Sequence, residues 1–293
     1  MKNRFFISLF IMLITMITLV ISCSDIHDED VVNTEHLKSM KLNGSILEEE
    51  TLLGDDIYLP KGTYWYYSNE HKNEVVFELP EEYIFLLKNI ETGKYILSIE
   101  GGGYSCTCGA GGSCTTFHNK DLGYSCLQSS CTGSCTGKAS AVLTPNLQIV
   151  GVLNAKNTLM DANIIQEKAS LSSDGIDGFF EIKEIKEEIK RTYDIIYKYA
   201  EKPDFESGIY DKNKYVYAKT LLYGFEIGII IPNDANLQEL IPNLNVSIIS
   251  DVDAPSSCSC SGGSQGGSCK LEKKGLLGYV AYFCNGCTTC TMS

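Results

Sequence analysis

The stretch that decides the fold reads Cys106-Thr107-Cys108-Gly109-Ala110-Gly111-Gly112-Ser113-Cys114. Its last four residues recur near the end of the chain as Gly266-Gly267-Ser268-Cys269. Each stretch belongs to a group of six cysteines, which we name the first and the second cysteine block. The first block is Cys106, Cys108, Cys114, Cys126, Cys131 and Cys135, and the second is Cys258, Cys260, Cys269, Cys284, Cys287 and Cys290.

The two blocks match at positions other than cysteine. Gly123 and Gly278 each lie inside Leu-Gly-Tyr, nine residues after the matched cysteine, with a constant offset of 155. Upstream the offset is 152, which aligns the two Cys-x-Cys pairs, and a three-residue insertion in the second Gly/Ser loop reconciles the two values. The cysteines between these points do not align without small gaps. Self-similarity of this kind is typical of a duplicated structural unit, so the sequence predicts two related modules.

Outside the blocks the chain consists mainly of short runs of β-branched and aromatic residues separated by turn residues, a pattern typical of strands. These runs cover residues 75–79, 83–87, 95–99, 147–153, 215–222, 225–231 and 246–249. Residues 83–99 hold two such runs around a polar loop, which predicts a hairpin.

One segment has helical periodicity. Apolar residues recur every three or four positions from Ile182 to Tyr197, which predicts an amphipathic helix that ends before Pro203, and a weaker pattern indicates a helix over 157–168. We therefore predict an α+β fold in which two related strand-rich modules, each ending in a six-cysteine Gly/Ser-rich loop, are joined by a helical segment.

The cysteine count bears on the chemistry of the blocks. Of 13 cysteines, Cys23 stands apart, and the remaining 12 form an even number that suits a disulfide framework in an oxidising compartment. Six cysteines allow 15 pairings, and the sequence does not choose among them. The alternative is a thiolate site for copper(I) or zinc, because Cys-x-Cys and Cys-x-x-Cys pairs supply closely spaced soft ligands. A redox site at Cys284 and Cys287 is disfavoured, because only six residues follow it and a thiol-activating helix does not fit.

The N-terminus has the features of an export signal. A basic start with Lys2 and Arg4 precedes an uncharged, mostly apolar run, which ends in Val20-Ile21-Ser22-Cys23. This arrangement resembles the lipobox of bacterial lipoproteins. The resemblance implies cleavage before Cys23 and acylation of its thiol, and hence an anchor in the lipid bilayer with the remaining chain outside the cytoplasm. The acidic residues that follow Cys23 resemble the signal that sends some lipoproteins to the outer face of the outer membrane.

The charge of the chain restricts its partners. The formal net charge is −13, and residues 24–56 carry ten carboxylates against two lysines. Nucleic acid is therefore not an expected partner, because its binding requires a basic surface that displaces counterions. The chain has no Gly-x-Ser-x-Gly, P-loop or His-Glu-x-x-His motif, so we expect neither an enzyme nor a cofactor.

These observations divide the chain into five parts: a lipoprotein signal peptide (1–22), a lipidated acidic tether (23–56), cysteine-rich module A (57–140), a helical connecting segment (141–209) and cysteine-rich module B (210–293). We expect a membrane-anchored lipoprotein, facing the cell surface or the periplasm, that acts as a disulfide-stabilised binding or structural module. Its rigid cysteine loops would present the contact surface for an unknown ligand or protein.

Overall fold

A computed structural model describes residues 41, 43–120, 122–156, 170–204, 211, 213–242, 247–250, 257–260, 270–276, 279–285 and 290–292. The chain divides into one compact unit from Met1 to Asn43 and another from Gly44 to Ser293, and the elements below belong to the second. The predicted signal peptide, Cys23 and the predicted helix over 157–168 lie outside the described residues. Among the residues that are described, no helix combines the length and the apolar character needed to span a bilayer.

The predicted fold class is wrong in its balance of helix and strand. Among the residues that the structure describes, strands far outnumber helices, and the sheets are antiparallel. The predicted helical joining segment is also incorrect, because it contains β12 (Leu147–Asn154), which pairs with β6 (Tyr83–Asn89) along seven residue pairs. The helical pattern at 182–197 is local, whereas β12 (Leu147–Asn154), in the same segment, belongs to a sheet.

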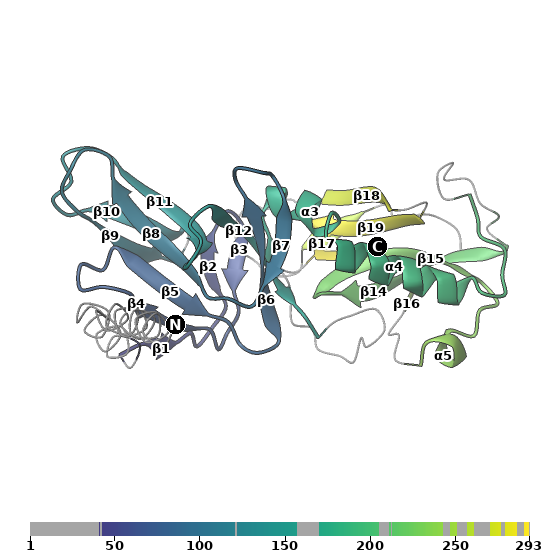
Figure 1. Cartoon of the computed structure of the whole chain (residues 1–293). Coiled ribbons are helices and arrows are strands. Elements are labelled where there is room, and N and C mark those ends of the chain that lie inside the picture. The colour runs from purple at the N-terminus through teal and green to yellow at the C-terminus, as the bar shows by residue number, and fades with distance from the viewer. Residues whose placement is uncertain are drawn as a thin grey trace, which may run out of the picture. The chain divides into compact units, whose positions relative to one another are not determined.

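The larger sheet follows the order β1-β4-β5-β8-β11-β12-β6-β7, with β13 beside β12 (Figure 1). Its other strands are β1 (Ser45–Ile46), β4 (Tyr64–Tyr67), β5 (Glu74–Glu78), β7 (Tyr95–Ser98), β8 (Gly102–Cys108), β11 (Cys135–Ala141) and β13 (Ser170–Leu171). The hairpin predicted at residues 83–99 is confirmed as β6–β7, which pair antiparallel with Phe85 opposite Ser98.

β6 separates two hydrophobic cores. Its first five residues are all buried, and side chains alternate between the two faces of a strand. Tyr83, Phe85 and Leu87 pack into one core, while Ile84 and Leu86 pack into the other. Because both faces are covered, β6 has a continuous apolar sequence in place of the alternation expected of a half-exposed strand.

Two small sheets contribute to the first core. They are β2 (Thr51–Gly54) with β3 (Ile57–Leu59), and β9 (Cys114–Asn119) with β10 (Gly123–Gln128). Leu53, Ile57 and Leu59 pack there with Tyr124 against residues of the larger sheet. Tyr124 is thus the residue through which the β9–β10 hairpin of the first cysteine block reaches the hydrophobic core.

The second core is formed with α3 (Ser173–Phe179), α4 (Lys183–Ile196) and a second sheet of order β16-β14-β15-β19-β18. The strands of this sheet are β14 (Tyr215–Leu222), β15 (Phe225–Pro232), β16 (Ser247–Ser250), β18 (Lys270–Leu276) and β19 (Tyr279–Asn285). Two further elements are α5 (Leu237–Leu240) and the pair β17 (Cys258–Cys260) with β20 (Cys290–Met292).

The amphipathic helix predicted from the sequence is confirmed as α4. Its buried face includes Ile185, Ile189 and Tyr193, and just beyond its end the Tyr197 hydroxyl donates a hydrogen bond of 2.9 Å to the Ile230 carbonyl in β15. Burial raises the pKa of Tyr197. The helix is therefore attached to the second sheet by both apolar contacts and a buried hydrogen bond.

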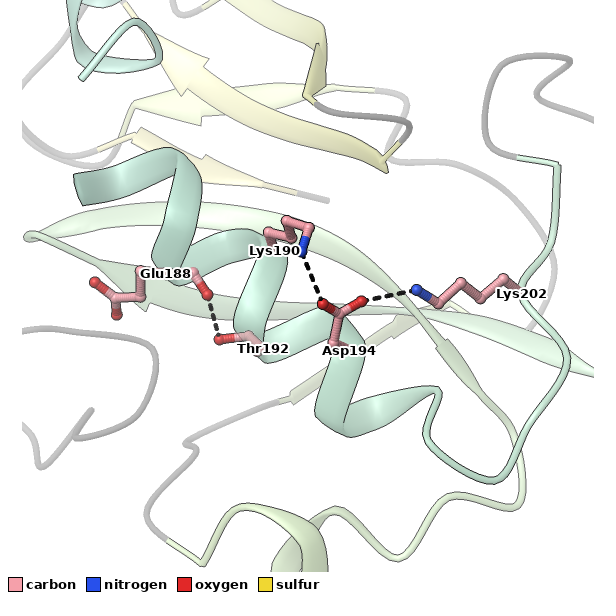
Figure 2. Close-up of polar contacts among 5 residues, drawn as sticks. All are labelled: Glu188, Lys190, Thr192, Asp194 and Lys202. Atoms are coloured by element: carbon pink, nitrogen blue, oxygen red, sulfur yellow. Dashed lines mark hydrogen bonds and ion pairs between the residues drawn. The ribbon is translucent and has the colours of Figure 1, made fainter. Parts of the chain in front are cut away.

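Figure 2 shows a set of short-range polar contacts on α4. Asp194 accepts from Lys190 at 3.3 Å and from Lys202, beyond the helix end, at 2.8 Å. The Thr192 hydroxyl donates to the Glu188 carbonyl at 2.9 Å, one turn earlier. Because the charged groups around Asp194 are largely exposed, these ion pairs order the end of the helix and contribute little to stability.

Candidate binding site

Three disulfide bonds join the cysteines of the first block: Cys106–Cys126, Cys108–Cys131 and Cys114–Cys135. In chain order the first cysteine bonds the fourth, the second bonds the fifth and the third bonds the sixth. The bonds connect β8 to β10, β8 to the loop after β10, and β9 to β11. The β9–β10 hairpin is thereby fixed to two neighbouring strands of the larger sheet.

The sulfur atoms replace a conventional apolar core in this part of the chain. Cys106, Cys114 and Cys131 are buried together, with the other three cysteines of the block and Tyr104 packed around them. By contrast, three large apolar residues of the hairpin and its turn are exposed, namely Phe117, Leu122 and Leu127. A small sheet with so little apolar burial requires cross-links to hold its conformation.

Gly123, one of the residues shared by both blocks, positions the hairpin against β2. Its φ of +76° lies in the left-handed region, and a Cβ atom placed on it would lie 2.8 Å from the Leu53 carbonyl oxygen. Any other residue would be strained in this conformation and would also collide with the backbone of β2. Glycine therefore allows the close approach that brings Tyr124 into the core.

The β17–β20 pair of the second block shares a register with the first block. Cys108 lies opposite Cys135 in the β8–β11 pair, and Cys260 lies opposite Cys290 in the β17–β20 pair. The register is the same at the next cysteine of each strand. Cys106 lies opposite Gly137, two residues after Cys135, and Cys258 lies opposite Met292, two residues after Cys290. These four strands thus place corresponding cysteines at corresponding positions.

The hairpins of the two blocks show which cysteines correspond where the sequence alignment failed. In β9–β10, Cys126 faces Thr116, which lies two residues after the third cysteine of its block. In β18–β19, Cys284 faces Leu271, again two residues after the third cysteine of its block. The strand register therefore equates Cys126 with Cys284.

The remaining predicted site residues are described only in part. Cys258 is disulfide-bonded. Cys260, Cys284 and Cys290 are placed in strands, whereas Cys23, Cys269 and Cys287 lie outside the described residues. The Sγ atoms of Cys108, Cys114 and Cys131 lie within 4.8 Å of one another, a spacing that a metal ion could bridge if these sulfurs were thiolates. In the structure all three are in disulfides, which lack the thiolate charge that metal binding needs.

A groove with a cavity volume of about 350 Å³ opens beside the cross-linked hairpin. It is lined by Ile46, Leu47, Glu48, Glu49, Thr51, Trp65, Tyr67, Thr116, His118 and Tyr124. These residues come from β1 and the loop after it, the start of β2, β4, and the two strands of the hairpin. The groove lies where the hairpin meets the outer strands of the larger sheet.

Four aromatic rings contribute to the lining of the groove. Trp65 and Tyr67 lie two residues apart on β4, so they point to the same face, and their rings meet edge to face at 5.6 Å and 87°. His118 and Tyr124 are opposite each other in the hairpin, with ring centroids 4.9 Å apart. On each side of the groove, the strands that carry these rings are held by backbone pairing with a neighbouring strand.

The hairpin side of the groove is anchored through Thr116. Its backbone N–H and its hydroxyl both donate to the Lys72 carbonyl, at 2.8 and 3.0 Å, which ties β9 to the loop between β4 and β5. The disulfide from Cys126, directly opposite Thr116, holds the other strand of the hairpin to β8. Hydrogen bonds and a disulfide thus maintain the separation between the aromatic side chains.

The electrostatic character of the groove is acidic. Partial burial lowers the pKa of His118, so its imidazole is neutral at pH 7. Burial also raises the pKa of Tyr124, which keeps its phenol protonated. The formal charges among the lining residues are therefore those of Glu48 and Glu49, which are both exposed at the rim.

A larger hollow of about 820 Å³ lies along β7 and the start of α4. Its charged lining residues have both signs, Lys94 and Lys183 with Glu181 and Glu184, and one aromatic residue, Tyr95. Because this mixture selects for no single charge or chemical class, the aromatic groove is the stronger candidate site.

The aromatic residues of the groove do not stand out as a site in the sequence. The run Tyr64-Trp65-Tyr66-Tyr67 has the aromatic composition of a strand, and alternation places Trp65 and Tyr67 on one face, but nothing local indicates that the hairpin meets that face. Comparison of the chain with protein-family models, with curated proteins and with solved structures finds no match.

Proposed function

We propose that the protein is a lipid-anchored binding lipoprotein outside the cytoplasm, in which a disulfide-braced sheet presents the aromatic groove to a small ligand. The observation that carries this proposal is the position of the groove. Two of its four aromatic residues, His118 and Tyr124, come from the hairpin that two disulfide bonds fasten to the larger sheet. Concave sites lined by aromatic side chains with a few polar groups are typical of small-ligand binding.

Rigidity supports a binding role. Each ring of the groove is mounted on a strand, and the hairpin is restrained by covalent bonds, so little conformational entropy would be lost when a ligand binds. The catalytic arrangement of a nucleophile, an oriented base and a group that stabilises developing charge is not formed by the lining residues. We therefore propose binding, without catalysis, as the activity of this site.

The single tryptophan of the chain allows a direct test. Because Trp65 lines the groove, a bound ligand should change its fluorescence, and a library of small metabolites can be screened against the full chain, exported to an oxidising compartment. Tyr67→Leu should weaken any binding that is found. Tyr66→Leu is the matched control, since Tyr66 lies between the two lining residues on the opposite face of β4. Equal loss in the two variants would refute the groove as the site.

The anchor is tested separately. The resemblance of residues 20–23 to a lipobox predicts that a radiolabelled fatty acid is incorporated into the wild-type chain and not into Cys23→Ala, and that the variant retains the uncleaved signal segment. Whole-cell protease treatment then distinguishes a cell-surface location from a periplasm-facing one. Unchanged labelling in the variant would contradict the assignment of Cys23.

The alternative function is thiolate binding of copper(I) or zinc. The proximity of the Cys108, Cys114 and Cys131 sulfurs is the observation that favours it. Alkylation of the unreduced, denatured protein followed by intact mass measurement separates the two functions. If no cysteine other than Cys23 is modified, the result supports the disulfide-braced module. Several adducts together with bound metal in the same sample would support the thiolate site.

A further inference from the structure

The chemistry of the aromatic groove points to a ligand class. Its lining carries two carboxylates, Glu48 and Glu49, and no lysine or arginine. Lys120 lies 3.8 Å from Glu49, and both side chains are highly exposed, so this ion pair is weak and easily displaced. The chain as a whole has a net charge of −13. An anionic ligand would meet repulsion here, and a cationic ligand would meet attraction.

The ring geometry fits a cation that lacks hydrogen-bond donors as well as one that has them. The faces of tryptophan and tyrosine rings carry negative charge density, and a cation within about 6 Å of a ring centre is attracted to it. Trp65 and Tyr67 stand at 87° to each other and form a corner in which one group can contact both side chains. The Lys72 ammonium, which does not line the groove, lies 5.3 Å from the centre of the Tyr67 ring, so this ring accepts a cation, and a ligand cation on the same face would have to displace Lys72.

We propose that the groove binds an organic cation, with an alkylammonium group placed against Trp65 and Tyr67 and its charge balanced by Glu48 and Glu49. This inference rests on the proposed binding function and adds the class of ligand. A cavity of about 350 Å³ suits a small molecule. Tyr124 and Ile46 supply contact for the apolar part of such a ligand.

Choline and its neutral isostere 3,3-dimethyl-1-butanol provide the test, because they have nearly the same shape and differ in the charge of one central atom. The full chain is purified in a non-ionic detergent, since zwitterionic detergents carry the group under test, and both compounds are titrated while Trp65 fluorescence is recorded. We expect choline to bind at least about tenfold more tightly, equivalent to about 1.4 kcal/mol. Raising the salt concentration should weaken the binding of choline and leave that of the isostere unchanged.

Charge variants identify the carboxylates. The double substitution Glu48→Gln with Glu49→Gln should reduce the difference between the two compounds to about two- to fivefold, because the ring contacts, which still favour the cation, remain. Glu50→Gln is the matched control, because Glu50 is the adjacent exposed carboxylate and does not line the groove. A loss of equal size in Glu50→Gln would overturn the assigned role of the rim carboxylates.

The outcomes separate the ligand class from the binding function. If both compounds bind equally, or if a neutral sugar binds and choline does not, the cation assignment is wrong while the groove remains a binding site. If neither the two probes nor any compound of the metabolite screen changes Trp65 fluorescence, and equilibrium dialysis of choline also shows no binding, both the ligand class and the proposed function are refuted.

Discussion

Removal of the Cys106–Cys126 disulfide tests how much the cross-links contribute to the first cysteine block. The two residues are 20 positions apart, and an isolated bond over that separation would stabilise the folded chain by about 3.3 kcal/mol by restricting the unfolded chain. The neighbouring Cys108–Cys131 bond shortens the path between them, because the chain can be followed from Cys106 through that bond and back to Cys126. The loop that is closed falls to about eight residues, and the expected contribution falls to about 2.5 kcal/mol.

The double variant Cys106→Ala with Cys126→Ala removes the bond without leaving a free thiol. Urea unfolding followed by Trp65 fluorescence reports on this region, because Trp65 lies on β4, which neighbours β5, and β5 pairs with β8. With a urea dependence of about 2–3 kcal/mol/M, the midpoint should fall by about 1 M. Thr107→Ala, an exposed position between two cysteines of the same strand, should change the stability by less than about 0.5 kcal/mol.

A midpoint shift below about 0.2 M in the double variant would refute the reasoning. Such a result would mean that the β9–β10 hairpin keeps its position without this bond, so hydrogen bonds such as those of Thr116 would be sufficient. A loss well above 4 kcal/mol would also contradict the estimate, and would show that the buried sulfur atoms contribute by packing as well as by limiting the unfolded chain.

The other predictions concern connectivity, backbone strain and pH. The register of the strands equates Cys258 and Cys284 with the bonded pair Cys106–Cys126 of the first block. Peptide mapping of the unreduced protein should therefore recover Cys258 linked to Cys284, and a link from Cys258 to any other cysteine would contradict the correspondence. Gly123→Ala should lower the free energy of unfolding in urea by about 2 kcal/mol or more. Gly93 has a similar φ of +70° and no atom near its Cβ position, so Gly93→Ala should lower it by about 1 kcal/mol, and equal losses would exclude the contact with Leu53 as the cause. Burial raises the pKa of Tyr223 to about 12 from an unfolded value of about 10, so its contribution to stability is complete below pH 10 and is lost as the pH rises through 12. Tyr223→Phe should therefore reduce the fall in the urea midpoint between pH 9 and 12, and a fall of the same size in this variant would contradict the assignment.

Several local elements could be predicted because their signals lie within a few residues. The helix α4 was visible from its apolar spacing, and the β6–β7 hairpin from two strand-like runs around a polar loop. The error in fold class came from extending the α4 pattern to a whole connecting segment. β12 lies within that segment, and its partner β6 is about 60 residues earlier in the sequence, so no local pattern could show that it completes a sheet.

The strand-rich composition, the two blocks of six cysteines and the acidic charge follow from the residues alone, because each depends only on residue type and spacing. Which cysteines of the first block bond to one another follows from how the strands pair in the folded chain, because sequence spacing alone is compatible with all 15 pairings. The binding groove likewise depends on the folded chain. Trp65 and Tyr124 are 59 residues apart, and they line one groove because β4 and the β9–β10 hairpin are brought together by long-range pairing and cross-links.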